Sequence, residues 1–276
     1  MENPSAAAGT AQNSSITGDL RLHEFSSRVF YNTRMLRVWL PPGYDEAENE
    51  GRRYPVFYLN DGQNLFDRAT AFAGVEWQVD ETADRLIREK KIQPLILVGI
   101  DNAQKERIRE FLPYRSVYPP VLRPQGRKYL KFLLDEVVPF VHQRYRIASG
   151  AGNTALGGSS LGAVISLFTV MERPGIFGRL LLESPSLYIS NRQLLKQGRA
   201  FRQWPERVFM AVGTSEAGNA GRSLEVVDDV RHLQRILQRS GLWENRLRVR
   251  IEEGATHNEA AWAARFPEAL EFLFGG

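Results

Sequence analysis

Residues 154–168 read T-A-L-G-G-S-S-L-G-A-V-I-S-L-F, and this stretch decides the fold. Of the seven residues 157–163, only Leu161 is larger than serine. An apolar, strand-like run precedes them and a helix-like run follows. This crowding of small residues indicates either an ordinary tight turn or a turn that brings a backbone and a hydroxyl group unusually close to something else.

Residues 158–162 match the pattern G-x-S-x-G, with Ser160 as the central serine. Between a strand and a helix, the pattern is typical of a nucleophile elbow, in which a serine on a sharp turn exposes its hydroxyl above the strand ends. Side chains two residues before and after that serine would collide, so Gly158 and Gly162 supply room. The backbone N–H of Leu161, at the start of the helix, is then placed to donate to a developing oxyanion.

Two alternatives compete with this interpretation. Gly152, Gly157 and Ser159 stand almost as in the phosphate loop G-x-x-x-x-G-K-[ST], but Gly158 occupies the position of the essential lysine, which argues against nucleotide binding. The other alternative is a strand-to-helix turn that has no catalytic part. Other residues of the chain are needed to distinguish a non-catalytic turn from a turn that carries a nucleophile.

Composition narrows the class of protein. A chain of 276 residues with 43% hydrophobic residues is long enough for one large α/β domain or two small ones. The formal charge is +4, but acids and bases are interleaved, and the densest basic run, 85–91, is broken by Leu86, Ile87 and Glu89. We therefore expect no nucleic-acid partner. The absence of cysteine excludes disulfides, thiolate metal sites and a cysteine nucleophile.

The N-terminal segment is small and polar. We expect residues 1–20 to form a disordered tail and residues 21–276 to form a single catalytic domain. The segment has neither the basic nor the apolar region of a secretory signal, and no run approaches the ~18 apolar residues of a membrane span. The expected location is cytoplasmic, with no membrane partner.

The hydrophobic pattern predicts an α/β fold. Its central sheet has about eight strands, mostly parallel with an antiparallel start, and helices cover both faces. The predicted strands are 22–30, 34–40, 54–59, 94–100, 154–159, 180–183, 208–212 and 247–252, and the predicted helices are 77–90, 129–145, 161–171, 224–240 and 259–274. The long connections 101–125 and 185–206 are candidates for walls or lids over a site, with plain surface elaboration as the alternative.

A serine nucleophile needs a base, and the chain has four histidines. His23, His142 and His232 fall inside predicted strands or helices, where packing or surface roles explain them. His257 follows the last predicted strand and precedes the last helix, so it emerges at the same edge of the sheet as Ser160. This position favours a general base over a solvated loop residue.

The acid that orients the histidine is expected between serine and histidine in chain order. Glu216 lies just past the strand 208–212, at the same edge of the sheet. Asp228 and Asp229 are competitors, but they fall within a predicted helix, where a solvated face explains them. The second oxyanion donor is expected after the strand 54–59, where Gly62 lets the backbone of Gln63 turn inward; a simple turn would use the same residues.

With these residues in place, the chain resembles the esterase family of α/β-hydrolases. That family includes enterochelin esterases, esterase D-type S-formylglutathione hydrolases, feruloyl and acetyl xylan esterases, and the antigen 85 mycolyltransferases. The resemblance covers nearly everything from residue 22 to 274. It is carried by Y-L-N-D-G-Q-N-L-F-D (58–67), V-E-W-Q-V-D (75–80), I-D-N (100–102), R-I-R-E-F-L-P (107–113), G-G-S-S-L-G (157–162), V-G-T-S-E (212–216) and H-N-E-A-A-W (257–262).

The resemblance implies a nucleophile, an acid, a base and an oxyanion hole, and the matching positions are Ser160, Glu216, His257 and the backbones of Gln63 and Leu161. It also suggests Trp77 and Trp262 near the pocket, although a buried tryptophan is more often simply core. Arg107, Arg109 and Glu110 would hold the long loop by ion pairs or meet substrate, and the structural role is favoured.

The function expected from these residues is a serine carboxylic-ester hydrolase. It would act through an acyl-enzyme on a small acyl, aryl or carbohydrate ester, with no metal and no organic cofactor. An acyltransferase that uses the same acyl-enzyme is one alternative, and a non-catalytic binding protein on the same fold is another. Acyl and alcohol specificity and oligomeric state are not readable from this pattern.

Overall fold

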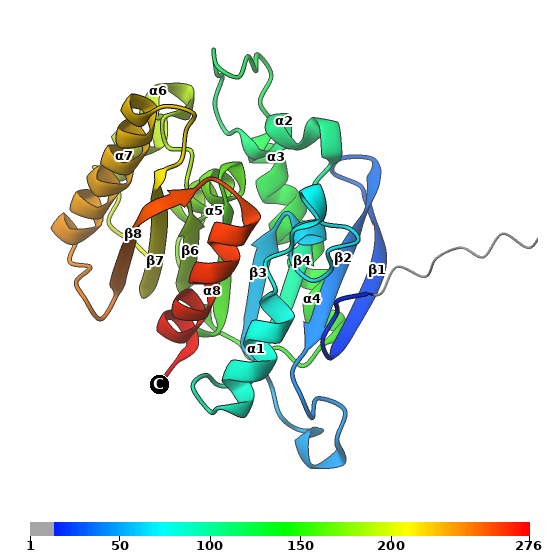
Figure 1. Ribbon diagram of the computed structural model, residues 1–276. Coiled ribbons are helices and arrows are strands. Elements are labelled where there is room, and N and C mark those ends of the chain that lie inside the picture. Colours follow the sequence, from blue (N-terminus) through cyan, green and yellow to red (C-terminus); the bar gives the residue numbers. More distant parts are fainter. Residues whose placement is uncertain (1–13) are drawn as a thin grey trace, which may run out of the picture.

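A computed structural model describes residues 14–276, and these residues form one sheet flanked by helices (Figure 1). Most of the predicted tail, residues 1–13, lies outside the described residues. The remainder contacts the domain, because the Thr17 N–H donates to an Asp80 carboxylate oxygen at 2.7 Å. The first strand begins at Asp19, two residues before the predicted domain boundary.

The sheet has eight strands, in the order β1-β2-β4-β3-β5-β6-β7-β8. The first two contacts, β1 with β2 and β2 with β4, are antiparallel, and all others are parallel. The predicted fold class is therefore confirmed. The strands are β1 (Asp19–Ser27), β2 (Asn32–Leu40), β3 (Val56–Asn60), β4 (Ile96–Ile100), β5 (Thr154–Ser159), β6 (Arg179–Glu183), β7 (Arg207–Ser215) and β8 (Leu247–Thr256).

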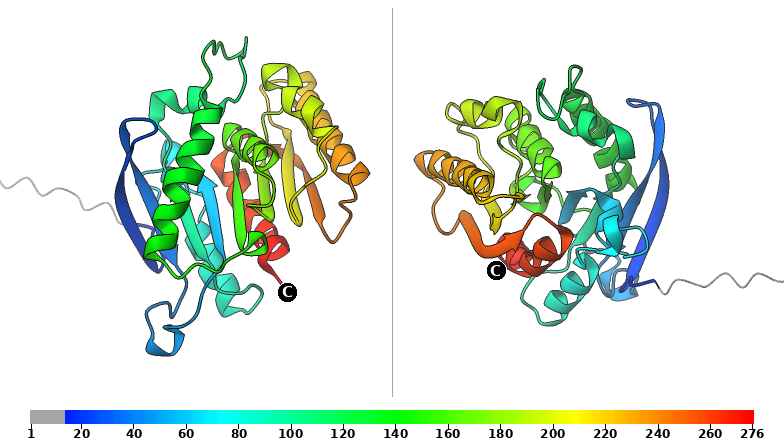
Figure 2. Two further views of the ribbon diagram at one scale, coloured as in Figure 1. Left: turned by 180° about the vertical axis from the view of Figure 1, so that it is seen from behind. Right: turned by 45° about the horizontal axis from the view of Figure 1, so that its top comes forward.

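Helices cover both faces of the sheet (Figure 2). Alternate residues of one strand serve the two faces: Phe57 and Leu59 of β3 pack with α1 and α8, whereas Val56 and Tyr58 pack with helices of the other face. The helices are α1 (Val79–Arg88), α2 (Arg107–Phe111), α3 (Gly126–Lys131), α4 (Val138–Arg144), α5 (Leu161–Glu172), α6 (Ile189–Gly198), α7 (Ala220–Arg239) and α8 (Glu259–Phe274).

The structure departs from the predicted elements in two regions. The single helix expected over 129–145 is divided into α3 and α4 by a π-helical turn, Phe132–Val137, just before Pro139, which has no N–H to donate. The connections 101–125 and 185–206, expected to be irregular, contain α2 and α6. Helix α2 has only five residues, and α6 begins with left-handed residues, Ser190 to Arg192, so neither shows a regular helical pattern.

Gly157 in β5 allows a close contact with β6. A Cβ atom at this position would lie 2.6 Å from the Cβ of Leu181. We expect Gly157→Ala to lower the free energy of unfolding by about 1–3 kcal/mol, because the strand has no room to move away. Urea unfolding measures this change, with Gly51→Ala as the control, since its Cβ would have no neighbour within 4 Å. Equal midpoints for the two variants would contradict the prediction.

Candidate active site

The predicted site residues lie at the carboxyl ends of the parallel strands. Gln63 follows β3, Ser160 follows β5, Glu216 follows β7 and His257 follows β8. In open α/β sheets, ligands bind at this edge. Sequence positions far apart in the chain therefore meet at one place.

Ser160 has the backbone geometry of a strained turn. Its φ is 55° and its ψ is −119°, in a region that side-chain-bearing residues rarely occupy. The flanking glycines make the turn possible: a Cβ on Gly158 would lie 3.1 Å from the backbone carbonyl carbon of Gly162, and one on Gly162 would lie 3.1 Å from a carboxylate oxygen of Asp61. The turn thus presents the hydroxyl of Ser160 at the sheet edge.

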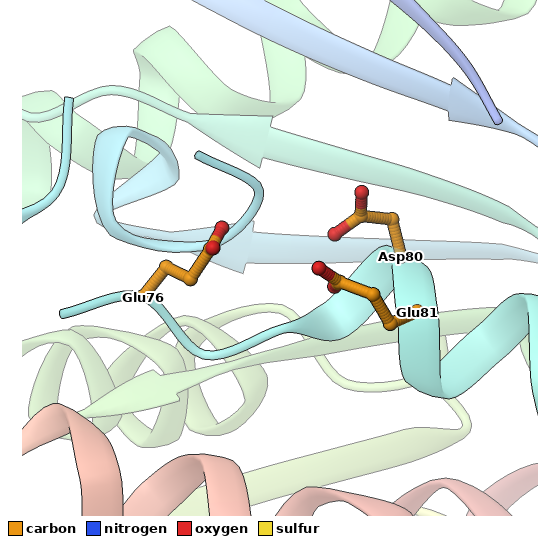
Figure 3. A group of neighbouring side chains, drawn as sticks. All are labelled: Glu76, Asp80 and Glu81. Carbon is orange, nitrogen blue, oxygen red and sulfur yellow. The ribbon is translucent and has the colours of Figure 1, made fainter. Parts of the chain in front are cut away.

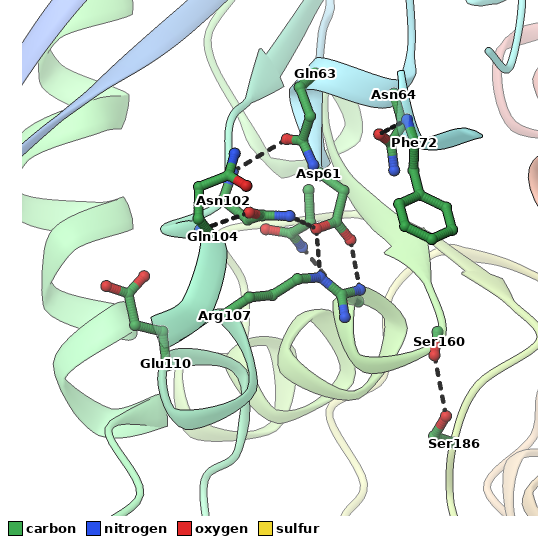
Figure 4. A network of polar contacts seen from close by, with 12 residues as sticks. Asp61, Gln63, Asn64, Phe72, Asn102, Gln104, Arg107, Glu110, Ser160 and Ser186 are labelled. Atoms are coloured by element: carbon green, nitrogen blue, oxygen red, sulfur yellow. Dashed lines mark hydrogen bonds and ion pairs between the residues drawn. The ribbon is translucent and has the colours of Figure 1, made fainter. Parts of the chain in front are cut away.

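The Ser160 hydroxyl lies in a pocket of about 390 Å³ that is also lined by Gln63, His257 and Trp262. Its hydrogen-bond partner is the Ser186 hydroxyl, with an Oγ–Oγ distance of 3.2 Å (Figure 4). Ser160 and His257 therefore share a pocket, and residues 14–276 show no hydrogen bond between them.

Glu216 and His257 are in direct contact. Nδ1 of His257 lies 2.5 Å from Oε2 of Glu216, whose side chain is 1% exposed. The other carboxylate oxygen accepts hydrogen bonds from the Ser184 hydroxyl and from the Gly213 N–H, both at 2.6 Å. Burial alone would raise the pKa of Glu216, but these hydrogen bonds and the contact with His257 outweigh it and lower the pKa. The carboxylate is therefore ionised at neutral pH, and Nε2 of His257 is left for the pocket.

Ser184 and Arg265 form a polar support behind Glu216 that sequence reasoning missed. The Ser184 hydroxyl accepts from Trp262 Nε1 at 2.9 Å and from Arg265 at 3.3 Å, so its own proton points to Glu216. Arg265 also pairs with the fully buried Glu183 at 2.9 Å. Burial raises the pKa of Glu183 to about 7, against the opposing effect of Arg265. A serine after a strand and an arginine inside a helix carry no motif that would identify them.

The two predicted pocket tryptophans have different environments. Trp262 lines the pocket, and its ring meets the His257 ring edge to face, with centroids 5.2 Å apart. Trp77 packs behind Trp262 at 5.7 Å and is buried in the core. Trp77 therefore lies outside the pocket lining, and its expected pocket position is corrected to a core position.

The two predicted oxyanion donors are backbone N–H groups without a protein acceptor. Within the described part of the chain, neither Gln63 nor Leu161 donates its N–H to another residue. Leu161 is the first residue of α5, where the first N–H groups of a helix are unpaired. Of the two residues, Gln63 lines the pocket.

Ion pairs hold the loop that carries Gln63 (Figure 4). Asp61, in a left-handed conformation with φ 61°, accepts two hydrogen bonds from Arg107 at 2.6 and 2.8 Å and one from Asn102 at 2.6 Å. The Asn102 N–H donates to the Gln63 side chain at 3.2 Å. Arg107 lines the pocket but its charge is engaged by Asp61, in line with the favoured structural role.

The other two residues of that segment also make ion pairs. Glu110 forms a buried bidentate pair with Arg34, at 2.9 and 3.0 Å. Arg109 pairs with Glu106 at 3.4 Å on the surface. Neither lines a pocket that contains Ser160 or His257.

The competing acids and bases have partners elsewhere. Asp229 pairs with Arg192 at 2.6 Å, and Asp228 with Arg231 at 3.5 Å. His23 contacts the Tyr145 hydroxyl at 2.6 Å on the opposite side of the sheet order from β7 and β8. Neither aspartate contacts His257.

A second pocket, of about 400 Å³, lies on the other side of His257. It is lined by Tyr118 and Tyr188 from the two long connections and by Val226 and Arg222 from α7. The tyrosines and Val226 give this pocket apolar walls, and Arg222, Glu216 and Glu225 add charged groups of both signs. The site therefore offers one polar compartment and one apolar compartment.

The eight-stranded sheet and the elbow at Ser160 define an α/β-hydrolase fold. Residues 27–273 match the sequence profile of the family Esterase, described as "Putative esterase". The chain therefore belongs to this esterase family and is a carboxylic ester hydrolase.

Individual relatives share about a third or less of the aligned residues with this chain. The uncharacterized protein YbbA of Bacillus subtilis is 24% identical over 264 residues, which cover 94% of this chain and 97% of that protein. The siderophore enterobactin esterase of Emericella nidulans is 34% identical over 179 residues, 57% of this chain and 54% of that protein. The crystal structure of the enterobactin esterase FES from Shigella flexneri is 17% identical with a TM-score of 0.72, and the match covers 94% of this chain and 60% of that one.

The described residues contain no helix that combines the length and the apolar character needed to cross a membrane.

Proposed function

We propose that the chain hydrolyses esters through an acyl-enzyme on Ser160, with His257 as the general base and Glu216 as the acid that orients it. The observation that carries the proposal is the hydrogen bond from His257 Nδ1 to the buried Glu216. His257 also lines the same pocket as Ser160. This bond fixes the tautomer, because the proton on Nδ1 leaves Nε2 as the proton acceptor.

In the first half of the reaction, the Ser160 hydroxyl turns from Ser186 toward Nε2 of His257. Its oxygen attacks the ester carbonyl carbon while Nε2 takes the proton. The carbonyl oxygen becomes an oxyanion and accepts hydrogen bonds from the N–H groups of Gln63 and Leu161. When the intermediate collapses, the carbon–oxygen bond to the alcohol breaks, and His257 returns the proton to the leaving oxygen.

In the second half, a water molecule takes the place of the alcohol. His257 removes one of its protons as the water oxygen attacks the acyl carbon, and the same two amides hold the oxyanion. The bond to Ser160 then breaks, the serine regains its proton from His257, and the carboxylic acid leaves. Glu216 stays ionised throughout and stabilises the protonated imidazole.

We infer that the acyl group is aromatic. The second pocket adjoins His257 and presents Tyr118 and Tyr188, whose rings favour an aromatic partner. Arg222 suits a phenolate or carboxylate on that partner. A relative named for feruloyl esters supports the same class.

An ester panel with covalent labelling tests the function. Purified protein is assayed with acetyl, butyryl and long-chain nitrophenyl esters, acetylated sugars and hydroxycinnamoyl or dihydroxybenzoyl esters, and then treated with a fluorophosphonate. We expect the highest kcat/KM for the aromatic acyl esters and a covalent adduct on Ser160. An adduct on Ser160 with a preference for aliphatic esters would overturn only the substrate class.

An acyltransferase would pass through the same acyl-enzyme but would use an alcohol in place of water. The polar pocket, lined by Asn64, Asn102 and Gln104 among others, has hydrogen-bonding groups that could hold a hydroxylated acceptor. Assays with sugar acceptors added at high concentration separate the two activities. Free acid as the sole product across the acceptor panel would exclude transfer.

Ser184 is a positioning residue in this proposal, because its hydroxyl donates to Glu216 and touches no reacting atom. We expect Ser184→Ala to lower kcat/KM about 10-fold, the size of one hydrogen bond to a charged group. Since that bond helps to lower the pKa of Glu216, its loss raises that pKa.

Stability gives a second readout for Ser184→Ala. A carboxyl with a lowered pKa contributes stability above its unfolded-state pKa, and this contribution is lost as the pH falls through the folded-state pKa. The variant should therefore lose stability at a higher pH than the parent on acidification. A uniform drop in Tm at every pH would indicate packing alone.

A further inference from the structure

Three carboxylates meet at the start of α1, outside the active site (Figure 3). Glu76 comes from the loop before the helix, and Asp80 and Glu81 come from its first turn. One carboxylate oxygen from each lies within 4.8 Å of the others. Figure 3 shows all three side chains directed at a common point.

Glu76 and Asp80 are buried and Glu81 is half-buried, and the nearest cationic influence on Glu76 among residues 14–276 is Arg68, which forms no ion pair with it. Glu76 is 5% exposed, and neither of its oxygens has a hydrogen-bond partner within residues 14–276. Asp80 is fully buried with Oδ1 unpartnered, and Oε2 of Glu81 is also buried without a partner. Across that same span, no lysine or arginine forms an ion pair with any of the three.

Protein groups relieve only part of this charge. The Thr17 N–H donates to Oδ2 of Asp80, and the N-terminal end of α1 favours acidic residues in its first turn. Asp67, which accepts hydrogen bonds from Ser14 and Ser15, adds a further carboxylate beside Glu76. Burying unpaired carboxylates costs several kcal/mol each unless they take up protons or pair with a positive charge, and a bound cation is one way to meet that cost.

We propose that Glu76, Asp80 and Glu81 bind a divalent cation of the calcium class. Carboxylate oxygens are the ligands that hard cations prefer, at about 2.3–2.6 Å for Ca²⁺. An ion equidistant from three oxygens that are each 4.8 Å apart lies about 2.8 Å from each, so a small inward movement of the side chains gives the distance that Ca²⁺ prefers. Mg²⁺, which needs about 2.0–2.1 Å and rigid octahedral geometry, fits the same oxygens less well.

The site is tied to the loop that carries Gln63. The Trp77 N–H donates to the Asn64 carbonyl at 2.9 Å, and the Val79 N–H donates to the Leu65 carbonyl at 3.2 Å. A cation bound between Glu76 and α1 therefore stabilises the segment that connects the loop after β3 to α1. Its effect on stability is independent of the catalytic role proposed for Gln63.

Calcium binding to the full chain tests the proposal directly. Protein is stripped with a chelator and dialysed, and then titrated with CaCl₂ or MgCl₂ while Tm and the heat of binding are measured. At Ca²⁺ about 100-fold above its Kd, we expect Tm to rise by about 5 °C, with a smaller rise for Mg²⁺. A Tm that stays within about 1 °C and no heat of binding at about 1 mM Ca²⁺ would overturn the proposal.

Glu76→Gln identifies the ligands, with Glu48→Gln as the matched control on the exposed segment Ala47–Asn49. Without calcium, Glu76→Gln should be at least as stable as the parent, because one buried charge is gone. With calcium, its Tm shift should disappear, whereas Glu48→Gln should keep the whole shift. A full shift in Glu76→Gln would place the ion elsewhere, and the carboxylates would then be held by shared protons, as the raised pKa of Asp80, about 8, permits.

Discussion

Ser160→Ala is expected to lower kcat for ester hydrolysis by about 10⁶-fold, the loss seen when a nucleophile of a serine triad is removed. Without the hydroxyl no acyl-enzyme forms, and the residual rate comes from the oxyanion donors and from substrate binding alone. Ser160 has a positive φ, and alanine carries the same Cβ as serine, so the substitution leaves the backbone strain of the turn unchanged. The variant therefore tests the loss of the hydroxyl group alone. Steady-state kinetics on an aryl ester measures the loss.

Ser159→Ala is the control for this variant, because it removes a hydroxyl one residue earlier from the end of β5. We expect it to keep activity within about 10-fold of the parent and to keep the fluorophosphonate adduct, which Ser160→Ala should lose. A parent-like rate in Ser160→Ala, or an adduct on another residue, would refute Ser160 as the nucleophile.

The position of the site at one edge of the sheet was predictable, because each expected site residue follows a predicted strand of the parallel part of the sheet. Ser160, Glu216 and His257 each stand directly after a strand, and the carboxyl ends of parallel strands lie at one edge of a sheet. The order of elements therefore predicts proximity. It does not predict that the Ser160 hydroxyl bonds Ser186, since that depends on where the loop after β6 runs.

The roles of residues that act through tertiary packing could not be predicted from the sequence. Trp77 was expected near the pocket, but its ring is buried in the core against Trp262, and Trp262 is the one that lines the pocket. Ser184 receives hydrogen bonds from two side chains of α8, and only the docking of that helix on β6 and β7 brings them together. A local pattern cannot report contacts across 80 residues of chain.

The acidic cluster shows the same limit. Residues 75–80 were recognised as one matching piece of the family resemblance, and the charges of Glu76 and Asp80 could have been solvated in a loop and on a helix. Burial against the segment 14–17 and the loop after β3 removes that explanation. A polar residue becomes informative when the fold deprives it of water.

Glu216→Gln is expected to lower kcat by about 10⁴-fold while the fold is kept. Glutamine has the same shape as glutamate. The donors Ser184 and Gly213 fix an oxygen on their side, so the amide NH₂ must face Nδ1 of His257. Nδ1 then has to accept a hydrogen bond, the proton moves to Nε2, and Nε2 can no longer take the proton of Ser160.

The matched control is Asp228→Asn, which neutralises the competing acid on the exposed face of α7. We expect this variant to stay within about threefold of the parent, since a loosely paired surface carboxylate contributes little. Circular dichroism at the assay temperature should show that all three proteins are folded, so that the loss in Glu216→Gln reports tautomer and charge rather than unfolding. If Glu216→Gln kept more than about a tenth of the parent kcat, another group would have to orient His257. Within residues 14–276, His257 Nδ1 has Glu216 as its hydrogen-bond partner, so such a result would remove the acid from the proposed triad.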